Sequence, residues 1–158
     1  MINYITGDAS FPEKTCPNGI KIIVHIVNDI GKWGAGFVLA LSKRWSNLKN
    51  DYQTHYRAYS LGDIYVSKTS DKDIYVVDLF GQHGIRTTFN PTVIRYGAVE
   101  QGLKKLRYRL EKASLKDVSI HMPKIGSGLA GGNWQIIENI INKVFDGSNI
   151  PIYVYDFK

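Results

Sequence analysis

The chain has 158 residues, of which 44% are hydrophobic and 22% are charged, values typical of a globular protein that folds as one domain spanning residues 1–158. Its formal net charge of +6 favours an anionic partner such as a nucleic acid, a nucleotide or a phosphorylated metabolite. The only cysteine, Cys16, excludes an internal disulfide and a cysteine-based zinc site, and the lack of a long apolar run or leader pattern predicts a cytoplasmic protein without a membrane partner.

The first half of the chain alternates between apolar runs typical of strands and segments with helical spacing. We expect strands at 2–7, 21–27, 62–69 and 73–80 and helices at 36–45 and 50–59. The strand at 21–27 is apolar on both faces except at His25, as in a central strand that helices cover on both sides. This pattern predicts a layered α/β architecture.

The second half begins with a long expected helix. Asn90 is the expected N-cap, Pro91 the first helical residue, and the apolar stripe continues towards Ala113. A strand at 118–122, a helix at 134–145 and a closing strand at 150–157 complete the expected elements. The order of elements is mixed but mainly alternating.

Two glycine-rich segments each follow an expected strand and precede an expected helix. They are "NDIGKWGAGFV" at 28–38 and "PKIGSGLAGGNW" at 123–134. Each can present backbone N–H groups to an anion, although neither contains the Walker or dinucleotide pattern. Either loop taken alone could be only a tight turn. Their matching positions at the carboxyl ends of strands favour a two-sided phosphate clamp.

A basic segment, "KKLRYRLEK" at 104–112, alternates with leucines at helical spacing. It fits a solvated helix face better than a stripe that binds nucleic acid. A basic RNA-binding domain remains an alternative function.

Five segments in the same order resemble the macrodomains, a family that binds ADP-ribose. They are "GDAS", "VHIVNDIGKWGAGFVLALSKRW", "GQHGIR", "HMPKIGSGLAGGNW" and "IYVYDF". The chain looks closest to the branch that contains a chromatin-remodeller macrodomain, a terminal ADP-ribose glycohydrolase and a yeast ADP-ribose-1''-phosphate phosphatase. The resemblance implies a three-layer α/β/α fold with a mixed central sheet, and a diphosphate between residues 34–37 and 126–131.

The resemblance also implies roles for individual residues. Asp8 would accept a hydrogen bond from the adenine amino group beside the Ala9 backbone, Phe157 would pack on the adenine, and Asn28 would face the distal ribose. Asp8 could instead form a turn, Phe157 could close the core, and Asn28 could cap the following loop. The implied ligand-binding residues are Asp8, Ala9, Asn28, Trp33, Gly34, Ala35, Gly36, Phe37, Gly126, Ser127, Gly128, Leu129, Ala130, Gly131 and Phe157.

Titratable and polar residues near the implied site give the catalytic candidates His25, Asn28, Asp29 and His83. A lone histidine in an apolar strand is more often a hydrogen-bonded core residue, but the place of His25 resembles that of a histidine implicated in the phosphatase relative. Asp29 could bind the loop backbone instead of substrate. Asp78 could support the site or be simply buried and hydrogen-bonded.

The sequence departs from the glycohydrolase pattern at two places. That relative uses a lysine nucleophile after the strand equivalent to 75–80 and an aspartate in its second glycine loop, where this sequence has Phe80 and Ala130. Lysine-dependent cleavage is therefore not expected. We expect a module that binds ADP-ribose or a derivative, including ADP-ribosylated protein or nucleic acid, without a cofactor or metal. A hydrolase acting on ADP-ribose-1''-phosphate or on ADP-ribosylated macromolecules is the alternative.

Overall fold

The computed structural model describes residues 1–157, apart from the side chain of Leu129, and is built around one six-stranded sheet in the order β1-β6-β5-β2-β4-β3. The strands are β1 (Ile2–Thr6), β2 (Ile20–Asn28), β3 (Ile64–Lys68), β4 (Ile74–Gln82), β5 (Val118–Pro123) and β6 (Ile152–Asp156). All neighbouring strands are parallel except the β3–β4 pair, which is antiparallel. The sheet is therefore mixed, as expected, and its parallel strands end at one edge.

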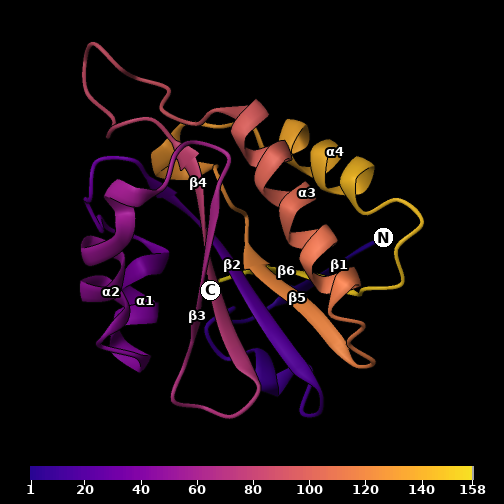
Figure 1. Ribbon diagram of the computed structural model, residues 1–158. Helices are drawn as coiled ribbons and strands as arrows, with labels where there is room; N and C mark the ends of the chain where they lie inside the picture. The colour runs from indigo at the N-terminus through magenta and orange to yellow at the C-terminus, as the bar shows by residue number, and fades with distance from the viewer. Residues whose placement is uncertain (158) are drawn as a thin grey trace.

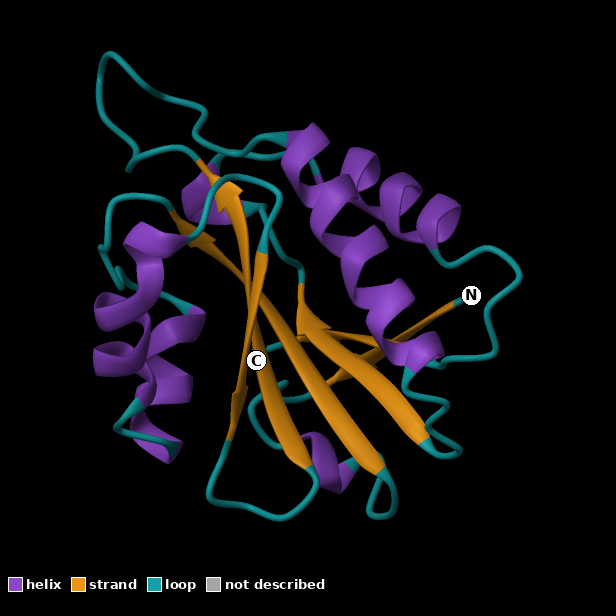
Figure 2. Ribbon diagram, viewed as in Figure 1, coloured by secondary structure: helices purple, strands orange, loops and turns teal. Residues whose placement is uncertain are grey.

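Helices cover both faces of this sheet. They are α1 (Phe37–Arg44), α2 (Leu48–His55), α3 (Tyr96–Lys112) and α4 (Trp134–Val144), with short 3-10 turns η1 (Pro12–Lys14), η2 (Tyr56–Ala58) and η3 (Gly128–Ala130). Figures 1 and 2 show α1 and α2 on one side of the sheet and α3 and α4 on the other. The three-layer α/β/α prediction is confirmed. Within residues 1–157, no helix combines the length and the apolar character needed to cross a membrane.

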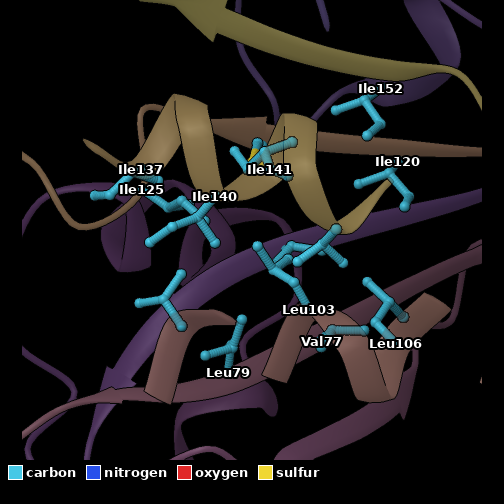
Figure 3. Close-up of a cluster of buried hydrophobic side chains, with 14 of the residues drawn as sticks. Val77, Leu79, Leu103, Leu106, Ile120, Ile125, Ile137, Ile140, Ile141 and Ile152 are labelled. Atoms are coloured by element: carbon cyan, nitrogen blue, oxygen red, sulfur yellow. The ribbon is translucent and has the colours of Figure 1, made fainter. Parts of the chain in front are cut away.

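The alternation of side chains along β2 and β4 separates two hydrophobic clusters. Ile22 and Val24 point to the cluster beneath α3 and α4, whereas Ile23 and Val27 point to the cluster beneath α1 and α2. Figure 3 shows the larger cluster, where side chains of β4 and β5 meet those of α3 and α4. His25 and Asp78 occupy the alternate positions that face α1, so their polar groups lie beneath the glycine-rich loop that precedes this helix.

The predicted start of the long helix was wrong. Helix α3 begins at Tyr96; before it, Pro91 lies in a bend and Ile94 forms a β-bridge with Gln82 at the end of β4. The His83 N–H donates to the Val93 carbonyl at 2.9 Å, and the Arg95 N–H donates to the Gly81 carbonyl at 2.8 Å. Ile94 is buried in the cluster that α3 also covers, so the apolar stripe extends upstream of the true helix start.

Candidate functional site

Three hollows lie along the edge of the sheet where the parallel strands end. The Asp8 hollow, beside the ends of β1 and β6, has a volume of about 480 Å³. The loop hollow, between the two glycine-rich segments, has about 250 Å³. The Asn28 hollow, beyond the end of β2, has about 620 Å³. Gly36 and Phe37 line both the Asp8 and loop hollows, and Ala35 and Gln82 line both the loop and Asn28 hollows, so the three form one cleft.

Most of the residues predicted to bind ligand line this cleft. The Asp8 hollow contains Asp8, Ala9, Gly36, Phe37 and Phe157. The loop hollow contains Ala35, Gly36, Phe37, Gly126, Ser127 and Ala130. The Asn28 hollow contains Asn28, Trp33, Gly34 and Ala35. Gly128 and Gly131 lie in and directly after η3, next to the loop hollow, while the Leu129 side chain lies outside the described residues.

The Asp8 hollow combines apolar walls with one carboxylate. Asp8 Oδ1 accepts hydrogen bonds from the Ser10 N–H at 2.9 Å and from the Ser10 hydroxyl at 2.6 Å. These bonds orient the carboxylate, and within residues 1–157 Oδ2 has no hydrogen-bond partner. Phe157 is 77% exposed and stands at the rim, so it is not a core plug. Apolar walls with a single acceptor suit a flat heterocycle that carries an N–H donor.

The first glycine-rich segment leaves backbone donors unused at the start of α1. Gly36 is the N-cap residue, with φ 79° and ψ −132°, a conformation available essentially to glycine alone. No side chain caps α1, and its first turn holds no acidic residue. The first N–H groups of a helix have no partner within the helix, so an anion in the loop hollow can accept from them.

Glycine occupies the positions of the second segment for two different reasons. A Cβ on Gly132 would lie 2.2 Å from the Gly126 carbonyl oxygen, and a Cβ on Gly126 would lie 2.6 Å from the Ile137 side chain. Both positions are glycine because the loop packs closely on itself and on α4. A Cβ on Gly128, by contrast, would meet nothing within 4 Å. Only that glycine borders open space.

A buried histidine–carboxylate pair reaches the loop hollow from the sheet. His25 and Asp78 are register partners on β2 and β4, and His25 Nε2 lies 2.5 Å from Asp78 Oδ1. A carboxylate only accepts, so Nε2 donates, which leaves Nδ1 as the ring nitrogen without a hydrogen-bond partner among the described residues. The ring packs edge-on against Trp33 with centroids 5.5 Å apart. These contacts fix the ring while its residue lines the hollow.

Asn28 lines its hollow but uses its amide mainly to close the loop. Its Oδ1 accepts from the Ile30 and Lys32 N–H groups, each at 3.1 Å, and from the Tyr52 hydroxyl at 2.8 Å. Its Nδ2 donates to the Lys32 carbonyl at 2.5 Å. These contacts agree with the alternative that Asn28 caps the loop that follows β2. One Nδ2 hydrogen remains for another acceptor.

Asp29 and His83 lie outside the lining of all three hollows. Asp29 Oδ1 accepts from the Gly84 N–H at 2.8 Å, and His83 Nδ1 lies 2.7 Å from Asp29 Oδ2. Burial raises the pKa of Asp29, but the hydrogen bonds from Gly84 and His83 outweigh it and hold this pKa below its usual value. The pair attaches the loop after β4 to the end of β2, and its catalytic role stays a prediction.

The side chain that the end of β4 presents to the cleft is Gln82, not Phe80. Phe80 is 1% exposed and stacks on Tyr59, so it is a core residue, and Gln82 is the side chain of this strand end that lines the cleft. Sequence reasoning also missed the basic residues Lys32, Lys49 and Arg86, which line the Asn28 hollow. They belong to three segments, and the sequence carries no spacing signal that would join them.

No protein-family model matches the chain. A protein of unknown function from Bacteroides thetaiotaomicron superposes with a TM-score of 0.85 at 41% identity, covering 99% of this chain and 98% of that one. A macrodomain protein from Streptomyces coelicolor superposes with a TM-score of 0.81 at 33% identity, covering 99% of this chain and 99% of the other. The chain belongs to the macrodomain family.

This macrodomain also resembles several curated proteins. The Chromodomain-helicase-DNA-binding protein 1-like of Mus musculus is 33% identical over 165 residues, which is 99% of this chain and 18% of that protein. The macrodomain thus spans less than a fifth of that relative. An ADP-ribose 1''-phosphate phosphatase of Candida albicans is 29% identical over 98% of this chain and 99% of its own length. An ADP-ribose glycohydrolase of Bos taurus is 26% identical over 98% of this chain and 90% of its own length.

The close packing of the second loop gives a testable pair of variants. We expect Gly132→Ala to lower the free energy of unfolding by about 2 kcal/mol, because its Cβ would overlap backbone that cannot move cheaply. Gly97→Ala in α3 is the control, since its Cβ would meet nothing within 4 Å and alanine favours the helix by up to about 1 kcal/mol. Urea unfolding measures both. A Gly132→Ala variant as stable as the native protein would contradict the described packing.

Proposed function

We propose that this macrodomain binds ADP-ribose or an ADP-ribose derivative along the cleft. The adenine would occupy the Asp8 hollow, the diphosphate the loop hollow, and the distal ribose the Asn28 hollow. The observation that carries this proposal is the order of the three hollows: an apolar one with a single carboxylate, one with unused helix N–H groups, and a polar one. The names of the phosphatase and glycohydrolase relatives, which both include ADP-ribose, support the same ligand.

The alternative of an RNA-binding domain receives less support. Its main basis was the basic segment 104–112, which forms the exposed side of α3. Lys104 pairs with Glu100 at 2.9 Å, Lys105 with Asp63 at 2.6 Å, and Arg107 with Glu111 at 3.1 Å. These cations already have acidic partners within the protein, as on an ordinary solvated helix face.

The Asp8 carboxylate gives the first test. We expect Asp8→Ala to weaken ADP-ribose binding about tenfold, because it removes a charged acceptor for the adenine amino group at a partly exposed site. Isothermal titration calorimetry with ADP-ribose measures this. Asp8→Asn, which keeps an acceptor oxygen but no charge, should give an intermediate loss.

A ligand that lacks the amino group makes this test specific. Inosine diphosphate ribose carries a ring carbonyl in that place, so its affinity should not fall in Asp8→Ala. Equal ADP-ribose affinity in the native protein and a folded Asp8→Ala variant would remove Asp8 from the site.

The first glycine-rich segment gives the second test. We expect Gly36→Glu to abolish ADP-ribose binding, because its side chain would fill the loop hollow and place a carboxylate beside the diphosphate. Gly97→Glu adds the same charge on the exposed side of α3 and should bind normally. Calorimetry and thermal unfolding are measured together, so that lost binding is not confused with lost folding. Undiminished affinity in Gly36→Glu would place the diphosphate elsewhere.

Hydrolysis of a group on the distal ribose is a second candidate function, and the His25–Asp78 pair favours it. His25 lines the loop hollow with its orientation fixed by Asp78, as a group that accepts a proton from water requires. Water oxygen would bond to phosphorus, the bond from phosphorus to the ribose oxygen would break, and a proton would pass to that oxygen.

Turnover measurements test this candidate. We expect hydrolysis of ADP-ribose-1''-phosphate or of ADP-ribosylated protein that persists with a chelator, since no group of three His, Cys, Asp or Glu side chains within residues 1–157 could hold a metal. Borohydride should trap no lysine adduct, because water attacks in this mechanism and the end of β4 presents Gln82 to the cleft instead of a lysine. His25→Gln should lower kcat while ADP-ribose still binds. A lysine adduct, or full turnover in His25→Gln, would refute the mechanism.

A further inference from the structure

Three basic side chains from three separate segments line the Asn28 hollow. Lys32 lies in the loop after β2, Lys49 in α2, and Arg86 in the loop after β4. The uncharged polar side chains of the lining are Asn28, Gln53 and Gln82, and no carboxylate from residues 1–157 contributes to it. This end of the cleft is therefore strongly positive.

These three cations are exposed, and what sets them apart is that they line one hollow without a carboxylate beside them. Within the described chain, Lys32, Lys49 and Arg86 form no ion pair and no side-chain hydrogen bond. Six other basic side chains are paired with carboxylates: Arg44, Lys104, Lys105, Arg107, Lys124 and Lys143.

The nearest carboxylates along the chain do not neutralise the cluster. Asp29 is held by Gly84 and His83. Asp51, two residues after Lys49, accepts from the Ser67 hydroxyl at 2.8 Å and from Tyr65 at 3.1 Å. Both acids are turned into other contacts, so the hollow keeps its positive charge for something outside the protein.

We propose that Lys32, Lys49 and Arg86 form an anion subsite for a phosphoryl group carried on the distal ribose of the bound nucleotide. This proposal rests on the proposed binding of ADP-ribose. The Asn28 hollow adjoins the loop hollow through Ala35 and Gln82. A ligand with its diphosphate in the loop hollow therefore extends its distal ribose, and any group attached to it, towards the three cations.

The chemistry of the attached group decides which class of ligand uses this subsite. ADP-ribose joined to a protein carboxylate carries an ester there, and the ester is uncharged. A phosphoryl group keeps one or two negative charges and has several acceptor oxygens, which suit charge-assisted hydrogen bonds from lysine and arginine. The subsite therefore favours phosphate-linked over carboxylate-linked ADP-ribose. The phosphoryl group has two sources, a monoester on free ADP-ribose or the terminal phosphate of a nucleic acid to which ADP-ribose is joined.

Calorimetry at low salt tests the subsite with three ligands: ADP-ribose, a non-hydrolysable phosphonate analogue of ADP-ribose-1''-phosphate, and an ADP-ribosylated single-stranded oligonucleotide. We expect the native protein to bind at least one phosphorylated ligand about tenfold more tightly than ADP-ribose. The triple variant Lys32→Gln, Lys49→Gln, Arg86→Gln should lose this advantage, so that it binds the phosphorylated ligands and ADP-ribose with affinities within about twofold of each other. Lys72→Gln, on the exposed β3–β4 turn at the opposite end of the sheet, is the control and should change neither affinity.

The outcomes separate this proposal from the proposed function. Native protein that binds ADP-ribose but gains nothing from a phosphoryl group overturns the subsite and leaves ADP-ribose binding intact. A phosphate advantage that survives in the triple variant also overturns it. An advantage for the phosphonate alone identifies a free nucleotide as the source, and one for the oligonucleotide alone identifies nucleic acid. Native protein that binds none of the three ligands refutes the proposed function itself.

Discussion

The parallel pairing of β2 with β5 on one side and β4 on the other determines where every part of the cleft lies. Parallel strands end at the same edge, so the loops that leave β2, β4 and β5 must meet there. The register of β2 with β4 shifts between Val27 and Asn28, so Asn28 stands opposite Gln82. That shift brings the last polar side chains of both strands to the rim of one hollow.

The two buried histidines of the sheet illustrate how position decides what a histidine can do. His121 on β5 is held between the Ser119 hydroxyl and the Tyr155 hydroxyl, each 2.7 Å away, so both ring nitrogens are satisfied. Burial, and then the charge of Lys21, lowers the pKa of His121 to about 4. His25 has only one nitrogen held, and it lines the cleft. The hydroxyl contacts satisfy both ring nitrogens of His121, whereas His25 Nδ1 has no hydrogen-bond partner among residues 1–157.

Local patterns in the sequence were enough to predict the fold. Apolar runs and helical spacing gave each strand and helix of the sheet and its two covering layers, and the resemblance to macrodomains is confirmed. The start of α3 was predicted wrongly because Val93 and Ile94 continue its apolar stripe while lying in extended chain. Burial produces the same pattern in both conformations, so hydrophobicity alone could not separate them.

Some residues of the candidate site could be predicted from local sequence patterns and others could not. The glycine loops and Asp8 lie within short segments whose order matches the family, so they could be found in the sequence. Only the tertiary fold brings Lys32, Lys49 and Arg86 to one hollow, and no regular spacing in the sequence predicts that they lie together. Phe80 was misplaced as the strand residue at the cleft because β4 continues to Gln82, so Phe80 lies within the core and Gln82 reaches the hollow.

The loop after β4 is fastened at both of its ends. Near its start, Asp29 accepts from the Gly84 N–H, and near its finish Ile94 bridges to Gln82. The residues between these points contribute Ile85 and Arg86 to the Asn28 hollow but belong to no helix or strand. Evolution can therefore lengthen, shorten or rewrite this span without disturbing the sheet. Sequence changes in this loop could therefore alter ligand specificity among related proteins while the sheet stays the same.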